Sequence, residues 1–327
     1  MKRRLQNRIS ESSATLPVAC VIATLLWWLP LGFFSWDFML GWIACALTAI
    51  VLAVFVVANA LLRVRSFMTV VVYVLTIGVC SFLHVISVGL VLSLLMAIAF
   101  LTLFRSYEKR EAVADSFHTA LCFSVGSLAW PPYIWLALVL LWGQGAFLRS
   151  LSWRVLGAWL VGLLMPYWFW VAGAFFLGDI SLPVMHLISI LSPWQEAFYW
   201  QPSVVENVRD LAEAHRAEAA ASAFVLLTGL TGFIHYLRNN YDDKIGVRMR
   251  YYCLMLTQVV LSLWLLLQPT VFDKLFPMLV LVTAPTISHF FALTHSWFSN
   301  AWFILCCLAL VWVAACCLTP TLWFPSF

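Results

Sequence analysis

Long apolar runs separated by short polar segments dominate the chain, and they do not alternate with a period of two. Lipid offers the backbone no hydrogen-bond partners, so only helices and closed barrels span it, and unbroken runs exclude the alternating pattern of a barrel. Runs of about 17 residues or more therefore predict membrane-spanning helices. Eleven spans are predicted, near residues 15–35, 38–62, 66–83, 84–104, 115–130, 131–148, 155–177, 220–237, 251–268, 276–295 and 300–318.

Two of the predicted turns carry no charge, Ser81 to His84 and Trp130 to Pro132. Merging the two helices on either side of one of these turns would reverse the membrane orientation of every helix that follows. Lys and Arg collect in cytoplasmic loops. With the N-terminus inside and both turns kept, only Arg209, Arg216 and Lys274 of the 18 Lys and Arg residues fall outside. The charge pattern thus predicts an all-α polytopic transmembrane helical bundle of about 11 spans, with the N-terminus inside and the C-terminus outside.

Composition agrees with a single transmembrane domain over residues 1–327. Hydrophobic residues make up 64% of the chain and charged residues 10%, against about 25% charged in a soluble domain. The basic start, Met1 to Arg8, resembles a signal peptide, but the apolar run continues without a small-residue cleavage site and is interpreted as an uncleaved first span. All nine cysteines fall in apolar runs, so we expect neither disulfides nor a metal site.

One sizeable segment outside the membrane is predicted, at residues 178–219. It carries six acids against two arginines. Residues 180–200 mix aliphatic and aromatic side chains, which is typical of an amphipathic segment in the interface plane. Ser203 and Glu206 form a capping box that predicts a following helix. The acidic balance favours a basic partner surface or metal-bridged lipid head groups.

Candidate chemistry is sparse, because every Lys, Arg, Asp and Glu can be placed in a loop or at a span end. Charges at mid-membrane mark ion pathways, so their absence argues against an ion-driven pump. The segment from Thr283 to His289 is the exception: Pro285 frees a backbone carbonyl, and Thr286 and His289 share one helix face. A helix broken in this way is how transporters build midplane sites; an ordinary proline kink, satisfied by Thr or Ser, is the competing interpretation. Pro166 is a second candidate kink in a binding site.

Asp37 and Asp273 are the only acids in short external turns. Membrane glycosyltransferases that use a polyprenyl-linked donor place such a carboxylate at the external interface as general base, which makes both residues catalytic candidates. Those enzymes usually have a long first external loop with further acids. The first external loop here is only a few residues, which counts against this function.

A set of aromatic, proline and arginine positions resembles a family of uncharacterised bacterial multi-pass membrane proteins over about residues 100–175. The resemblance implies a bacterial inner (cytoplasmic) membrane location and a similar number of helices, with Arg149, Trp153, Arg154 and Pro166 as structural landmarks, and it implies no activity. The matching segments are Phe104-Arg-Ser-Tyr107, Trp130-Pro-Pro-Tyr133, Phe147 to Arg154 and Gly162 to Tyr167.

Three functions stay open. The first is a non-enzymatic envelope component that handles lipids, lipid-linked glycans or a partner complex, and elimination favours it. The second is a membrane-embedded glycosyltransferase, and the third is a small-solute transporter. The expected partners are membrane lipids, together with a lipid-linked glycan or a membrane protein. No cofactor is expected, and no motif indicates nucleic acid.

Overall fold

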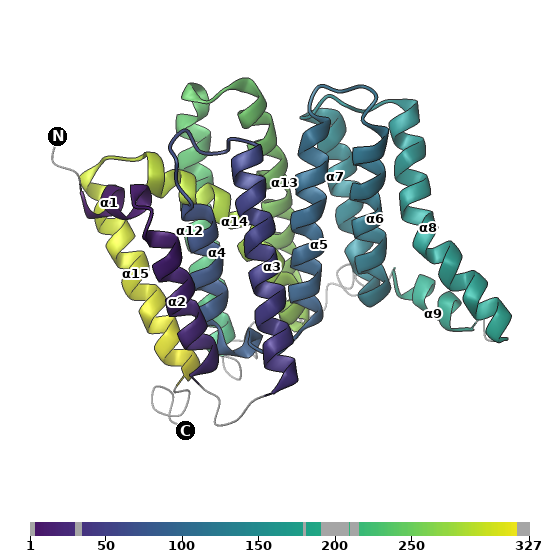
Figure 1. The fold of residues 1–327 in the computed structure, drawn as a ribbon, viewed down its shortest axis with the longest axis horizontal. Helices are drawn as coiled ribbons and strands as arrows, with labels where there is room; N and C mark the ends of the chain where they lie inside the picture. Colours follow the sequence, from purple (N-terminus) through teal and green to yellow (C-terminus); the bar gives the residue numbers. More distant parts are fainter. Residues whose placement is uncertain (1–3, 30–34, 179–180, 191–208, 210–215, 319–327) are drawn as a thin grey trace.

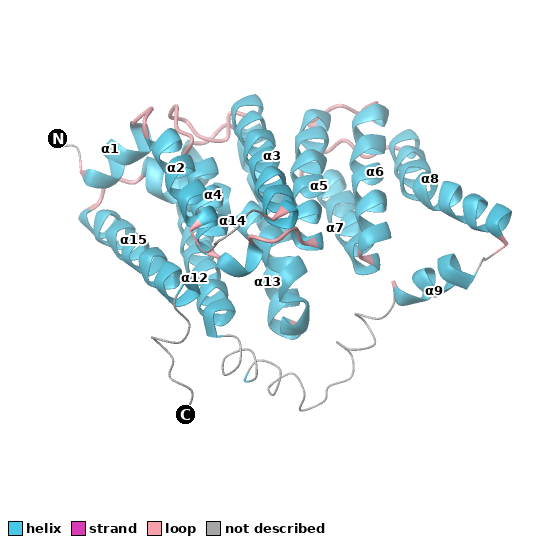
Figure 2. Ribbon diagram, turned by 60° about the horizontal axis from the view of Figure 1, so that its bottom comes forward, coloured by secondary structure: helices cyan, strands magenta, loops and turns pink. Residues whose placement is uncertain are grey.

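The computed structural model describes residues 4–29, 35–178, 181–190, 209 and 216–318, which are helical apart from turns and loops, with no strand among them (Figures 1 and 2). Two short helices, α1 (Leu5–Glu11) and α9 (Ser181–Ser189), lie at the ends of a bundle. The helices that run along the bundle are α2 (Thr15–Trp28), α3 (Trp36–Ala58), α4 (Met68–Val79), α5 (Val88–Leu103), α6 (Val113–Ala129), α7 (Ile134–Ala146), α8 (Trp153–Leu177), α12 (Arg216–Asn239), α13 (Ile245–Leu267), α14 (Phe272–Leu293) and α15 (Trp297–Leu318).

Among the described residues, seven helices are long and apolar enough to cross a membrane, or eight if α1 and α2, which are bent by 91°, count as one span. The seven are α3, α5, α8, α12, α13, α14 and α15. The other predicted spans are helical but short, since α4 has 12 residues and α7 has 13. At 1.5 Å per residue, 12 residues cover roughly 18 Å of a hydrocarbon core about 30 Å thick. Helix length and composition therefore support a helical membrane bundle but fewer spans than the predicted eleven.

The chain is broken at both uncharged turns. Helix α4 ends at Val79, a short 3₁₀ turn follows, and the Ser87 hydroxyl caps α5 by accepting from the Leu90 amide at 3.4 Å. Helix α6 ends at Ala129, and a second 3₁₀ turn over Pro131–Tyr133 leads into α7. Proline at the start of a turn lacks only an amide that would have no helical partner.

His84 closes the first of these turns. Its ring stacks on Trp27 with centroids 4.3 Å apart, and Nε2 donates to the Gly78 carbonyl at 3.0 Å. The side chain is buried, and this burial lowers the pKa of His84 from 6.5 to about 4. The turn thus encloses a neutral imidazole.

Helix α14 is the centre of the bundle. All of its most apolar stretch is buried, and it packs against α4, α5, α12 and α13 (Figure 1). Gly232 of α12 allows a close approach, because a Cβ there would lie 2.8 Å from the carbonyl carbon of Thr286. Small residues are the usual means by which helices in lipid pack tightly.

Cationic loops gather at one end of the bundle, the end at which α1 also lies (Figure 1). Arg63 pairs with Asp243, and Ser66 donates to the Ser10 carbonyl at 2.5 Å. Arg250 Nη1 donates to the Asn59 carbonyl at 3.4 Å. We call this the cationic end. It comprises α1 and the loops at residues 59–67, 104–112, 147–152, 240–244 and 294–296.

Only part of the predicted external segment lies within the described residues. Residues 181–189 form α9, whose apolar side chains Leu182, Met185 and Ile188 are exposed. His186 Nε2 lies 2.9 Å from the Ser127 carbonyl and holds α9 against the end of α6 (Figure 2). The Ser203 and Glu206 capping box lies outside the described residues.

We predict that Gly232→Ala destabilises the protein although alanine favours helix. The added methyl group meets the α14 backbone, and overpacking of this kind costs about 1–3 kcal/mol, more than the roughly 1 kcal/mol gained in helix propensity. The measurement is the thermal unfolding midpoint in detergent. Gly173→Ala in α8, where the methyl group meets nothing within 4 Å, is the matched control and should raise the midpoint or leave it unchanged.

We also predict that acid weakens the fold through His84. In the unfolded chain His84 takes up a proton as the pH falls below 6.5, whereas in the folded chain it stays neutral down to about pH 4. The free energy of unfolding is therefore highest above pH 6.5 and decreases as the pH falls from 6.5 to about 4. The loss expected from one such histidine is about 1–3 kcal/mol. Unfolding midpoints at about pH 7.5 and about pH 4.5 measure it. His84→Gln should lose less stability on acidification than the wild type; an equal loss would contradict the assignment.

Candidate functional site

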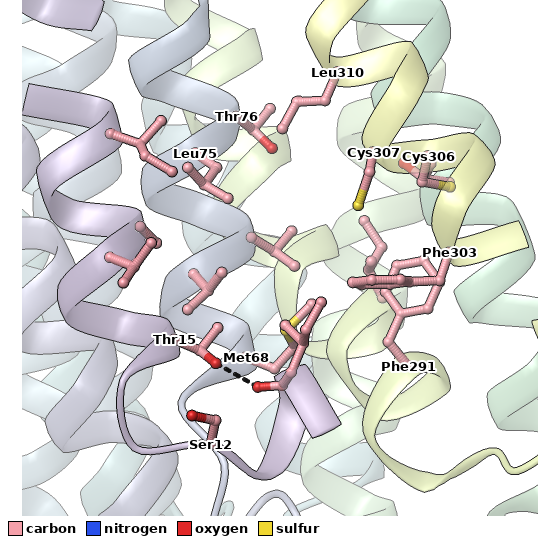
Figure 3. A pocket seen from close by; sticks show the side chains of 18 of the residues that line it. Ser12, Thr15, Met68, Leu75, Thr76, Phe291, Phe303, Cys306, Cys307 and Leu310 are labelled. Atoms are coloured by element: carbon pink, nitrogen blue, oxygen red, sulfur yellow. Dashed lines mark hydrogen bonds between the residues drawn. The ribbon is translucent and has the colours of Figure 1, made fainter. Parts of the chain in front are cut away.

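An apolar groove of about 480 Å³ lies between α2, α4, α14 and α15 (Figure 3). Ser12 and Thr15 lie at one end of it, and Thr76 and Leu310 lie toward the other. We call this cavity the apolar groove. Its apolar lining includes Ala19, Ile22, Met68, Leu75, Phe291 and Phe303.

Helix α1 closes one end of the groove. The Gln6 side-chain amide donates to the Phe291 carbonyl at 2.5 Å, and the Asn7 amide donates to the Thr294 carbonyl at 3.1 Å. The last carbonyls of a helix have no intrahelical partner, so these two side chains cap α14. Arg8, which is exposed, is held at this end and is the only charged side chain among the described lining residues.

The composition of the groove determines what fits it. The apolar chain of a ligand packs along α2, α4 and α15, where it is removed from water or replaces a membrane lipid. A charged group on the same ligand then lies near Arg8 at the cationic end. Pockets for small ligands typically measure about 300–1,000 Å³ and combine an apolar lining with few polar groups. The groove therefore suits an amphiphile with one apolar chain.

The binding residues predicted on α14 are all buried, but the helix is not broken. Helix α14 continues through Pro285, whose carbonyl accepts from the Ser288 hydroxyl at 2.8 Å. Thr283 donates to the Leu279 carbonyl, and Thr286 donates to Gln258 Oε1 at 3.2 Å. These groups are satisfied within α14 and by α13, as in an ordinary proline-containing helix.

Pro166 lies in a different part of the bundle. It is inside α8, which is continuous and packs mainly on α6 at the edge of the molecule (Figure 1). The structure therefore does not bring Pro166 together with the α14 residues.

Asp37 and Asp273 lie at the end opposite the cationic end. Each is in the first turn of its helix, α3 or α14, and each side chain is exposed. The Asp37 carbonyl accepts from the Ile86 amide at 3.0 Å, which ties α3 to the turn before α5. Neither carboxylate lines the apolar groove or the polar pocket described below. The general-base role of both residues therefore stays a prediction.

His289 takes part in a network of ion pairs that the sequence did not predict. Its Nε2 lies 3.1 Å from Asp243 Oδ2, and both side chains are 1% exposed. Arg63 Nε donates to the other oxygen, Asp243 Oδ1, at 2.6 Å, and Arg63 Nη1 lies 3.2 Å from Asp242. Burial alone would raise the pKa of the Asp243 carboxyl, but the hydrogen bonds from His289 and Arg63 outweigh it and hold that pKa below its usual value.

Aromatic rings enclose the His289 imidazole. Tyr236 and Tyr251 stack on each other with centroids 4.2 Å apart and meet the ring edge-on at 4.8 and 5.5 Å. His289 Nδ1 is buried without a hydrogen-bond partner. The ring lines a cavity of about 830 Å³ at the cationic end, which we call the polar pocket. Its charged and titratable lining residues are Arg63, His235, Arg238, Tyr241, Asp242, His289 and His295.

Sequence reasoning identified His289 but missed Asp243, Arg63 and the tyrosines. Asp243 is in a loop, as predicted for every acid, yet the loop folds its side chain into the protein. The available signal was the pair Asp242-Asp243, the only acids in a segment that otherwise carries Arg238, Lys244 and Arg248.

The fold defines a helical membrane protein with a polar ion-pair network at one end. No family model, curated protein or solved structure matches the chain.

We predict that Asp243→Asn destabilises the protein by about 3 kcal/mol or more, because removing one partner of a buried pair leaves the others uncompensated. Asp242→Asn is the matched control. This variant also converts a carboxylate to an amide, and Asp242 pairs with the same arginine, but its side chain is 53% exposed. The substitution should therefore lower the free energy of unfolding by less than about 1 kcal/mol. Unfolding midpoints of the two variants measure the difference, and equal effects would contradict the network.

Proposed function

We propose that this protein is a non-enzymatic membrane component that binds a lipid in the apolar groove. The observation that carries the proposal is the groove itself, with an apolar lining in the bundle and with Arg8, at its end, as the one charged side chain among the lining residues that the structure describes. A bacterial inner-membrane location is part of the proposal and follows from the resemblance over residues 100–175.

The surroundings of the groove support a lipid as occupant. Val18, Ile22 and Leu310 line it from α2 and α15, and Val18 is 54% exposed, so the groove continues onto an apolar surface. In a bilayer that surface meets acyl chains, and a lipid enters sideways without leaving the membrane. Membrane-bound cations attract anionic head groups at about 1 kcal/mol per charge, so Arg8 favours an anionic lipid.

The proposed orientation places the cationic end, α1 and Arg8 in the cytoplasm, in keeping with the positive-inside rule. Arginines at this end also pair with the neighbouring loops: Arg154, in the first turn of α8, lies 2.9 Å from Glu111 in the loop at residues 104–112. We infer that the short helices α2, α4, α6 and α7 cross together with the seven long ones. This gives the eleven spans of the charge pattern, with the C-terminus outside.

The experiment is native mass spectrometry of the full chain released from its membrane. We predict a bound lipid that Leu75→Trp reduces, because the indole occupies the groove toward which Leu75 points (Figure 3). Val21→Trp is the matched control, since Val21 of α2 is 59% exposed and does not line the groove. It should retain the lipid.

Arg8→Gln tests the head group. In nanodiscs that mix phosphatidylglycerol and phosphatidylcholine, the wild type should retain phosphatidylglycerol about fivefold more than the variant does, which corresponds to the loss of one interfacial charge. A polyprenyl-linked species in the wild-type spectrum would identify the lipid-linked glycan class. Equal lipid retention by wild type and Leu75→Trp would overturn the proposal.

A further inference from the structure

The polar pocket at the cationic end is separate from the apolar groove and is not used by the proposed function. It lies between the last turns of α12 and α14 and the loops at residues 59–67, 240–244 and 294–296. Its volume of about 830 Å³ is within the range of small-molecule sites. Its lining is more strongly charged than that of the apolar groove.

An unpartnered nitrogen points to a ligand. His289 is 1% exposed, and Asp243 occupies its Nε2, so Nδ1 is left as a buried polar atom without a partner in a residue that lines the pocket. Buried polar atoms in native proteins nearly always have a partner, and an exception needs a water or ligand to explain it. The pocket supplies the space for one.

The free polar groups of the pocket are mainly donors. Asp242 is the only carboxylate among the described lining residues, and Arg63 already engages it. Arg238 lines the pocket and forms no ion pair with any described residue. On α12, Asn239 donates to His235 Nδ1 at 3.0 Å, which leaves His235 Nε2 as the free ring nitrogen.

We propose that the polar pocket binds an oxyanion, with His289 Nδ1 and the Arg238 guanidinium as its principal ligands. The shared chemistry is a phosphate, sulfate or carboxylate group, carried either by a free anion or by a lipid head group. Charge-assisted hydrogen bonds to such groups are the strong ones.

The arrangement couples anion binding to a proton. Asp243 accepts from Nε2, so Nδ1 donates to an anion only when both ring nitrogens carry a proton. Binding of the anion is therefore linked to the uptake of one proton, and anion affinity rises as pH falls. The titratable and charged groups in contact with His289 are His235 and Tyr236 on α12, Tyr251 on α13 and Asp243 in the following loop. The others that line the same pocket are Arg63, Arg238, Tyr241, Asp242 and His295.

Titration calorimetry of the full chain in detergent with sodium sulfate tests the proposal, because sulfate keeps its charge between pH 6 and pH 8. Wild-type affinity should be higher at pH 6 than at pH 8, by up to about tenfold per pH unit for one linked proton. His289→Gln should lose about tenfold in affinity at pH 6 together with most of the pH dependence. Arg238→Gln should lose affinity and keep the pH dependence.

Two exposed residues outside the pocket provide matched controls, His118→Gln on α6 and Arg110→Gln in the loop before it. Both should bind sulfate as the wild type does. A parallel arm measures phosphatidylglycerol retained by wild type and Arg238→Gln: a loss in the variant assigns the site to a head group, and sulfate binding alone assigns it to a free anion. Unchanged sulfate affinity in Arg238→Gln, or no binding of either probe, would overturn the proposal. Because Arg238 is exposed, Arg238→Gln should fold and keep the proposal testable even if His289→Gln does not fold.

Discussion

Helix α14 is surrounded by α4, α5, α12 and α13, and this enclosure determines where the other polar groups of the chain lie. A helix with no face toward lipid or water must pair its polar side chains internally, because each unpaired buried group costs about 1–3 kcal/mol. Ser288 meets Thr69 of α4 at 2.6 Å, and Thr286 meets Gln258 of α13. His289, near the end of α14, forms no such hydrogen bond to a neighbouring helix. Its partner is Asp243, whose side chain lies buried although the residue is in a loop.

Close packing makes this enclosure possible. In lipid the apolar surfaces of helices are already solvated by acyl chains, so association depends on tight van der Waals contact and interhelical hydrogen bonds. Gly232 brings α12 against the α14 backbone, and Gly89 does the same for α5, since a Cβ there would overlap the Asp273 carbonyl. The α12 residues that line the polar pocket run from Thr231 to Asn239, so the pocket begins at the level of the Gly232 contact.

Apolar runs were enough to predict the helices and both uncharged turns, because burial and helix breaking are local properties of the sequence. They did not give the lengths of α4 and α7, which the turns and the neighbouring helices determine. The Thr283 to His289 segment was recognised as unusual, yet the predicted break at Pro285 does not occur, and α14 continues through Pro285 as far as Leu293. The pairing of His289 with Asp243 spans 46 residues, and no periodicity encodes a contact between a helix and a distant loop.

The two cavities share one wall, the last two turns of α14. Ile287 and Phe291, four residues apart, line the apolar groove, whereas His289, Phe290 and Leu293 line the polar pocket. Residues at i and i+4 occupy one helix face, so a rotation of this turn about the helix axis would reshape both cavities at once. The Gln6 amide, bonded to the Phe291 carbonyl, opposes such a rotation. Helix α1, which carries Gln6, therefore holds the geometry of a cavity in the bundle and of another at its cationic end.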